Sequence, residues 1–215
     1  MPLYKTITVD EGTKVLIWKI EETLDWLVDD IQLTNHCQQR VNGMKSILHK
    51  RGFMSIRHLF AEMGYTDHDL YYDENGKPHL KDGKCISITH SFNFTAIIIS
   101  EDEVGIDIEK QRDKILKIAE KFTPLKEYHT LANEEALIRK LTIVWGAKES
   151  IYKLHAEPGL GFLQHINISD FDFDNKRTTG KVYFKGKSTS YELKFLEFEG
   201  FTCVYAKLAK VSIKK

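Results

Sequence analysis

Polar and apolar residues alternate in several short segments of the chain, a pattern typical of β-strands with one buried face. Residues 3–9 and 13–20 show this alternation and predict a hairpin around Glu11-Gly12. Farther along, LYYDENGKPHL carries an Asn-Gly turn signal, and three short strands follow with tight connections: CISITHS, FTAIIIS and VGIDIEK. Residues 166–211 alternate in the same way and predict four more strands.

Other segments have apolar residues at helical spacing. TLDWLVDDIQL is one, with Thr23 as its expected N-cap, and residues 38–63 form a longer one, in which Gly43 and Gly52 weaken the helical pattern. KILKIAEKF and PLKEYHTLAN are also helical in pattern, the second with proline at its first position. The strongest helix is predicted over residues 134–155, where EPGLG ends it.

The order of these elements predicts an α+β protein built from two halves that meet near residues 100–104. We therefore expect an N-terminal subdomain over residues 1–102 and a C-terminal subdomain over residues 103–215. No flexible linker separates them, so we expect the two to pack tightly.

The strand VGIDIEK carries two carboxylates close together. Because successive side chains of a strand point to opposite faces, Asp107 and Glu109 share one face, and Ile106 and Ile108 share the other. Like charges held this close repel each other, so the pair requires a positive partner. Taken alone, the segment could also be a solvated strand face.

A third carboxylate lies on the helix predicted over residues 134–155. Glu149 and Lys153 are four residues apart and share a helix face, with Trp145 one turn earlier. By itself such a pair is routine on a solvated helix. Together with the two strand carboxylates, however, it makes a set of oxygen ligands that suits a hard divalent cation such as Mg²⁺. We therefore expect a metal ion to be the positive partner.

Composition narrows the class of protein. The 215 residues have a formal net charge of zero and are 42% hydrophobic, as in an ordinary globular protein, so we expect no binding to nucleic acid or to a membrane. The apolar runs are too short to span a bilayer, and the N-terminus lacks the apolar stretch of a signal peptide. The three cysteines are widely spaced and form no metal-ligand pair, so a cytoplasmic location is the simplest expectation.

Taken together, VGIDIEK and WGAKESIYK resemble the two-part signature of the 4′-phosphopantetheinyl transferases. Four other segments resemble the family in the same order: YYDENGKPHL, ISITHSFNF, IAEKFTPLKE and EPGLGF. The chain length is similar to that of the surfactin-synthetase-activating type, a single-chain pseudo-dimer. This resemblance implies two similar subdomains related by a pseudo-twofold axis, each an antiparallel sheet packed with helices. It also implies an active site at their interface and a monomer.

The reaction implied by the resemblance moves the 4′-phosphopantetheine of coenzyme A onto a serine of an apo acyl or peptidyl carrier protein. Adenosine 3′,5′-bisphosphate is the other product. Mg²⁺ held by Asp107, Glu109 and Glu149 would bind the pyrophosphate, and Lys153 would meet the charge that develops on the phosphate. Asp107, Glu149 and Lys153 are thus the expected catalytic residues. Two acceptors for the serine proton stay open, Glu149 and a metal-bound water.

Coenzyme A also needs cationic and donor groups, and the resemblance implies Lys77 in the Gly-Lys-Pro turn together with Thr89 and His90. Without the resemblance, Lys77 would be read as an exposed hairpin residue and His90 as a structural histidine. Lys148 is expected either to contact a phosphate or merely to anchor its helix. In HKRGFMSIR, Arg51 is a candidate for the 3′-phosphate, with ordinary solvated-helix charge as the alternative.

Two positions depart from the family pattern. Thr89 stands where the family has serine and keeps the hydroxyl group. Gly146 stands where the family has a small hydroxyl residue, so one hydroxyl group is lost after Trp145.

Carrier helices that present the serine are usually acidic, so we expect a basic and apolar docking surface. Residues 111–133 are a candidate because they mix Lys114, Lys117, Lys121 and Lys126 with Ile115, Leu116, Phe122 and Leu125. Two alternatives to the transferase are an enzyme that acts on another phosphate ester or pyrophosphate, and a catalytically silent module that binds coenzyme A or a carrier.

Overall fold

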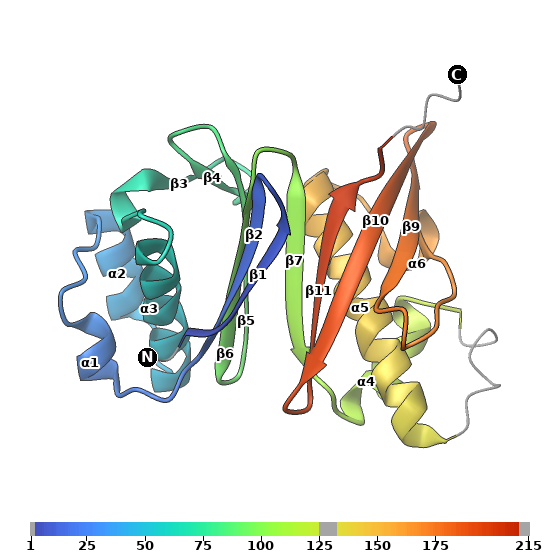
Figure 1. Ribbon diagram of the computed structural model, residues 1–215, viewed down its shortest axis with the longest axis horizontal. Helices are drawn as coiled ribbons and strands as arrows, with labels where there is room; N and C mark the ends of the chain where they lie inside the picture. Colours follow the sequence, from blue (N-terminus) through green and yellow to red (C-terminus); the bar gives the residue numbers. More distant parts are fainter. Residues whose placement is uncertain (1–2, 125–132, 211–215) are drawn as a thin grey trace. The chain divides into compact units, whose positions relative to one another are not determined.

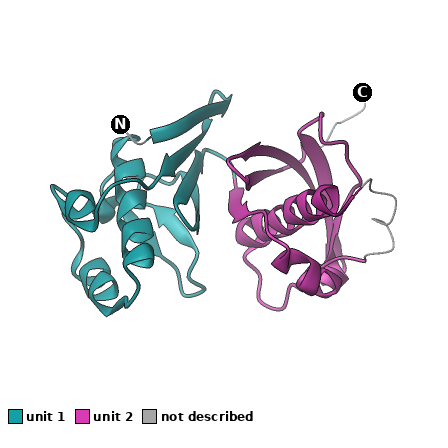
Figure 2. Cartoon of the chain, turned by 90° about the horizontal axis from the view of Figure 1, so that it is seen from below, with its two compact units in different colours: residues 1–102 teal, residues 103–215 magenta. Residues whose placement is uncertain are grey.

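The computed structural model describes residues 3–124 and 133–210. The chain divides into two compact units, residues 1–102 and 103–215 (Figure 2). Each unit is an antiparallel sheet packed with helices, which confirms the predicted α+β class. The pseudo-twofold relation of the halves, the active site at their interface and the monomeric state stay predictions.

The first unit contains a six-stranded sheet with the strand order β1-β2-β6-β5-β4-β3 (Figure 1). Its strands are β1 (Leu3–Asp10), β2 (Thr13–Lys19), β3 (Leu70–Tyr72), β4 (Pro78–Leu80), β5 (Cys85–Ser91) and β6 (Phe94–Ser100). The β1–β2 hairpin is confirmed, since Asp10 pairs with Thr13 across the turn. The Asn-Gly turn is confirmed between β3 and β4, where Gly76 has a φ of 80° that suits glycine.

Three helices belong to this unit: α1 (Leu24–Val28), α2 (Asn35–Gly43) and α3 (Ile47–Ala61). A short 3₁₀ helix, η1 (Asp67–Asp69), precedes β3. Thr23 caps α1 as predicted, because its hydroxyl accepts the N–H of Trp26 at 3.3 Å. Leu59 and Phe60 of α3 are fully buried and belong to the same core as Ile97 of β6.

The single long helix predicted over residues 38–63 is wrong, because the chain forms α2 and α3 there. The break falls just before Ser46, whose hydroxyl accepts the N–H of His49 at 3.4 Å and caps α3. Gly52 does not interrupt α3. It lies inside the helix, where an added Cβ would stand 3.2 Å from the ring of His90.

The second unit contains a five-stranded sheet with the strand order β7-β11-β10-β9-β8 (Figure 1). The strands are β7 (Val104–Lys110), β8 (Ile166–Ile168), β9 (Arg177–Phe184), β10 (Lys187–Phe198) and β11 (Phe201–Leu208), so the four strands predicted after residue 166 are confirmed. Its helical elements are α4 (Lys114–Ile118), the 3₁₀ helix η2 (Ala119–Lys121), α5 (Glu134–His155) and α6 (Phe162–His165).

Helix α5 has the bounds predicted from its apolar spacing. Asn133 caps its start by accepting the N–H of Ala136 at 2.9 Å, and Ala156 ends it in the left-handed conformation. The helical prediction for PLKEYHTLAN falls largely on residues outside those described. None of the helices within the described residues is both long and apolar enough to cross a membrane.

Helix α5 lies unusually close to β7 and β11, and two glycines make this possible. A Cβ on Gly105 of β7 would overlap the backbone carbonyl oxygen of Ser150 in α5. A Cβ on Gly146 of α5 would stand 2.9 Å from Cγ2 of Val204 in β11. The hydroxyl of Ser150 also donates to the carbonyl of Val204 at 2.9 Å. Because the helix and strands are this close, short side chains of β7 can reach the middle of α5.

Candidate active site

Asp107 on β7 points toward α5, as the predicted alternation along the strand requires. Its side chain is nearly buried, and Oδ1 accepts a hydrogen bond from the ammonium of Lys153 at 2.8 Å. The same ammonium donates to the carbonyl of Ile106 at 3.0 Å. The positive partner that the structure shows for Asp107 is therefore Lys153, while the metal ion stays a prediction.

Glu149 lies one turn before Lys153 on α5 and is half-buried. Burial raises the pKa of its carboxyl group, the negative charges of Asp107 and Glu109 raise it further, and Lys153 lowers it, with a net pKa of about 7. The three carboxylates therefore lie in one another's electrostatic field. As they stand, no three His, Cys, Asp or Glu side chains of residues 3–124 and 133–210 are gathered closely enough to hold a metal ion.

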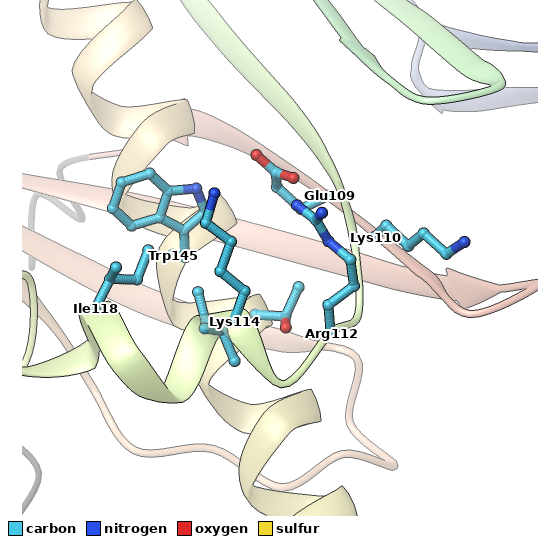
Figure 3. Close-up of a pocket in the computed structure, with 8 residues that line it drawn as sticks. Glu109, Lys110, Arg112, Lys114, Ile118 and Trp145 are labelled. Carbon is cyan, nitrogen blue, oxygen red and sulfur yellow. The ribbon is translucent and has the colours of Figure 1, made fainter.

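A pocket of about 130 Å³ lies beside Glu109, within the second unit (Figure 3). Its lining residues come from the end of β7, the connection after it, α4 and the middle of α5: Glu109, Lys110, Arg112, Lys114, Ile115, Ile118, Thr142 and Trp145. In Figure 3, Lys114 runs alongside the indole of Trp145, and the charged ends of Glu109 and Arg112 lie on the same side of the pocket. Lys110 points away from them.

Arg112 was not among the residues that the sequence patterns predicted for this site. The available signal was the charged run EKQRDK, which starts within the acidic strand and continues beyond its end. A run of mixed charges is common on solvated surfaces, however, so only the fold of α4 back against α5 shows that this one borders a pocket.

Lys148 is almost completely buried rather than exposed at the pocket. Its ammonium donates to the carbonyl of Phe162 at 2.8 Å and to that of Ile166 at 2.6 Å. Of the two roles considered for Lys148, this geometry favours anchoring. A phosphate contact would require the ammonium to leave both carbonyls.

In the first unit, Arg51 and His90 lie toward the same end of the sheet. The guanidinium of Arg51 donates to the carbonyl of Ile20 at 3.1 Å, and the N–H of Ile20 donates to the carbonyl of Asn93 in the β5–β6 turn at 2.7 Å. His90 is exposed and packs against α3 at Gly52. The ring of His90 thus lies beside Gly52, the residue that follows Arg51 on α3, which no sequence pattern indicated.

The remaining coenzyme A candidates have different surroundings. Thr89 precedes His90 on β5 but is buried. Lys77 lies in the β3–β4 turn, where its backbone N–H donates to Oδ1 of Asp73 at 2.9 Å. Arg57 of the basic stretch is buried and paired with Asp67 at 2.8 Å, so it serves the core of the unit and not a solvated helix face.

Comparison with known proteins places this arrangement in a class. A family model described as the 4′-phosphopantetheinyl transferase superfamily matches residues 103–206, which include Asp107, Glu149 and Lys153. The 4′-phosphopantetheinyl transferase gsp of Aneurinibacillus migulanus is 30% identical over 170 residues, which cover 74% of this chain and 69% of that protein.

The two findings first define the class: this α+β chain is a group-transferring enzyme, and the group is phosphopantetheine. The chain belongs to the 4′-phosphopantetheinyl transferase superfamily. The resemblance of VGIDIEK and WGAKESIYK to the family signature is thereby confirmed.

Proposed function

We propose that this enzyme transfers the 4′-phosphopantetheine of coenzyme A to a serine of an apo acyl or peptidyl carrier protein in an Mg²⁺-dependent reaction. The observation that carries the proposal is the close packing of α5 on β7. It pairs Asp107 with Lys153 at 2.8 Å and brings Glu149 into the field of Asp107 and Glu109. This is the charge arrangement that a reaction on a pyrophosphate needs, because such catalysis consists mostly of positioning and charge neutralisation.

The chemistry of the donor set fits the metal ion, although the three carboxylates would have to draw closer together to hold it. Asp107, Glu109 and Glu149 would hold Mg²⁺, because this ion prefers oxygen ligands and uses a few carboxylates beside its substrate oxygens. The pKa of Glu149 is raised chiefly by burial and then by the negative charges of Asp107 and Glu109, and a nearby cation would offset that part of the rise that comes from repulsion. When bound there, Mg²⁺ supplies positive charge to the pyrophosphate oxygens.

The chain's own residues bind the substrate and move the proton. The serine oxygen forms a bond to the phosphorus that carries the phosphopantetheine, and the pyrophosphate bond to adenosine 3′,5′-bisphosphate breaks. Lys153 stabilises the charge that develops on the phosphate oxygens. Of the side chains at the site, Glu149 is the one that we assign as acceptor of the serine proton. We assign Arg51, Lys77, Thr89 and His90 to the binding of coenzyme A.

Intact-mass spectrometry of several apo carrier proteins, incubated with the enzyme, coenzyme A and Mg²⁺, tests the proposal. We expect at least one carrier to gain one phosphopantetheine group, and the gain to be lost with EDTA or in Glu149→Gln. No gain on any carrier, with binding of coenzyme A still measurable, would instead support a silent binding module.

For the carrier, we propose docking on the basic segment that starts at α4. Lys114, Lys117 and Lys121 are exposed there, as an acidic partner requires. Phe122 is buried and packs edge-on against Trp145 at 5.0 Å between ring centroids, so it belongs to the core and not to the docking surface. Lys126 and Leu125 lie outside the described residues.

Charge reversal tests this docking surface. Lys117→Glu combined with Lys121→Glu should raise the KM for an acidic carrier and leave the KM for coenzyme A unchanged. The same double reversal at Lys181 and Lys194, two exposed lysines of β9 and β10, is the matched control. If the KM for every carrier stayed at the wild-type value, the carrier would dock elsewhere.

A further inference from the structure

The ammonium of Lys148 connects the middle of α5 to α6. It donates hydrogen bonds to the carbonyl oxygens of Phe162 and Ile166, and we call these two bonds the Lys148 brace. Only 2% of Lys148 is exposed. Removing a lysine ammonium from water is unfavourable unless polar partners replace the lost hydration. The carbonyl oxygens at 2.8 and 2.6 Å are such partners, and they accept two of its three protons.

The segment held by the brace has few local contacts of its own, chiefly the N–H of Gly161 donated to Nδ1 of His165 at 2.8 Å. Helix α6 is a single turn of four residues, and no side chain caps its N-terminus. Isolated helices of this length are unstable in water because nucleation is unfavourable. Lys148 bonds the carbonyl of the first residue of α6, Phe162, and that of the residue after its last, Ile166. The brace therefore holds both ends of α6 against α5.

The side chain of Phe162 connects the braced turn to the pocket through its packing on Trp145. Its ring lies 5.4 Å from that of Trp145 and 5.5 Å from that of Tyr152, measured between centroids. Trp145 is in turn a wall of the pocket that Glu109 borders (Figure 3). Phe122 packs on the indole as well, at 5.0 Å. The orientation of Trp145 thus depends on aromatic neighbours, one of which sits on the braced turn.

We propose that Lys148 is a positioning residue: by holding α6 against α5, it keeps Phe162 packed on Trp145 and so sets the shape of the pocket beside Glu109. The part that concerns turnover rests on the proposed function. Lys148 itself does not touch the reacting atoms. Its effect reaches the site through α6, Phe162 and Trp145.

The chain offers a matched control on the same helix. Lys140 of α5 is also buried, at 4% exposure, and its ammonium donates to a carboxylate oxygen of Asp170 at 2.6 Å and to the carbonyl of Phe171. It lies two turns before Lys148 and bonds a different loop. Lys140→Met and Lys148→Met each remove one buried ammonium that has two hydrogen-bond acceptors: a carboxylate and a carbonyl for Lys140, two carbonyls for Lys148. Both should lower stability, but only the second releases α6.

The first readout needs no turnover. The full chain is labelled with 5-fluorotryptophan, and the ¹⁹F signal of Trp145 is assigned by its loss in Trp145→Phe. The signals of Trp18 and Trp26, which belong to the first unit, serve as internal references. We expect Lys148→Met to shift or broaden the Trp145 signal and Lys140→Met to leave it in place. An unchanged Trp145 signal in Lys148→Met would overturn the proposal, whether or not the enzyme transfers phosphopantetheine.

The second readout is kinetic, at a temperature at which both variants are folded. Lys148→Met should lower kcat/KM on the order of ten- to a hundred-fold, as expected for small displacements at a reacting site, and Lys140→Met should stay near the wild-type value. Equal reductions of kcat/KM in the two variants would mean that Lys148 has only a structural role. If Lys148→Met does not fold, the ¹⁹F signal of Trp145 in the variant Phe162→Leu tests the proposal instead. This variant keeps the brace but removes the ring, and an unchanged Trp145 signal there would also overturn the proposal.

Discussion

At the scale of single residues, Glu149 holds a charge that the folded protein disfavours. In the folded state its pKa is about 7, raised from the ordinary value of 4.5 chiefly by burial and then by Asp107. As the pH rises, this carboxyl group therefore ionises at a lower pH in the unfolded chain than in the folded protein. From about pH 4.5 upward, the ionised carboxylate therefore reduces stability, and the reduction is complete above pH 7. Active-site groups often lower stability in this way.

Glu149→Gln should consequently raise the melting temperature of the metal-free protein at pH 8 and leave it nearly unchanged at pH 4, where the glutamate is protonated in both states. Scanning calorimetry in EDTA measures both values. Glu157→Gln is the control with the opposite sign, because hydrogen bonding to Lys185 lowers the pKa of Glu157. If Glu149→Gln raised the melting temperature by the same amount at pH 4 and pH 8, the electrostatic explanation would be contradicted.

At the scale of elements, the contact between α5 and β7 depends on the absence of a side chain at Gly105. In Gly105→Ala the new Cβ would overlap the carbonyl oxygen of Ser150, which is backbone and cannot rotate away. The helix must then move away from the strand. We expect a loss of about 1–3 kcal/mol in unfolding free energy, together with loss of transfer activity because the distance between Glu149 and Asp107 increases. Urea denaturation and the mass assay measure the two effects.

Gly43→Ala is the comparison for this prediction. No atom lies within 4 Å of a Cβ at Gly43, which ends α2 outside the left-handed region. Alanine there should be neutral or stabilising by up to about 1 kcal/mol. Equal losses for the two substitutions would mean that the approach of α5 to β7 is less close than described.

A buried ion pair connects α2, α3 and η1 in the first unit. Arg57 of α3 donates from two nitrogens to Oδ1 of Asp67, at 2.8 and 3.0 Å, and Oδ2 of Asp67 accepts the N–H and hydroxyl of Thr34, the N-cap of α2. Burial by itself would raise the pKa of Asp67. The N–H of Thr34 and the charge of Arg57 outweigh that effect and lower the pKa below its ordinary value of 3.8. The pair therefore contributes stability above pH 3.8 and loses it as pH falls through the lowered value.

Arg57→Met should reduce the unfolding free energy by about 3–5 kcal/mol at neutral pH, because Asp67 is left charged and buried. Adding Asp67→Asn should recover part of the loss. The difference between Arg57→Met and the wild type should shrink as the pH falls below 3.8, because the wild type then loses the stability that the lowered pKa of Asp67 provides. Denaturant titrations at several pH values measure this difference in unfolding free energy. If the loss in Arg57→Met did not depend on pH, the stabilisation by Arg57 would not be electrostatic.

At the scale of the whole molecule, charge balance governs solubility. Equal numbers of acidic and basic residues give a formal net charge of zero and an isoelectric point near 7.1. Molecules without net charge repel one another least. Solubility should therefore be lowest near pH 7 and rise at pH 8.5, and polyethylene glycol precipitation measures it. A flat solubility profile between these pH values would show that local patches, and not net charge, control association.

Local information in the chain was enough for most elements and for the family. The alternation in VGIDIEK and the helical spacing from Glu134 to His155 are periodic patterns over neighbouring residues, and their period depends only on backbone geometry. The same patterns place Asp107 and Glu149 on defined faces of a strand and a helix. The boundary at Ser46 was missed, because a capping hydroxyl competed there with an apolar pattern that continued past it.

Tertiary structure alone decided which partner each charged side chain takes. Lys153 bonds Asp107, 46 positions earlier in the chain, and not Glu149, its neighbour on the helix. The sequence left open whether Lys148 contacts a phosphate or anchors its helix, and whether Arg57 is a solvated helix charge. Both are buried, and Lys148 bonds two backbone carbonyls while Arg57 bonds Asp67. A long cation can reach several groups, and which of them it meets depends on how closely remote segments approach. That approach is set by packing, here by glycines at the contact of α5 with β7 and β11, and no local periodicity encodes it.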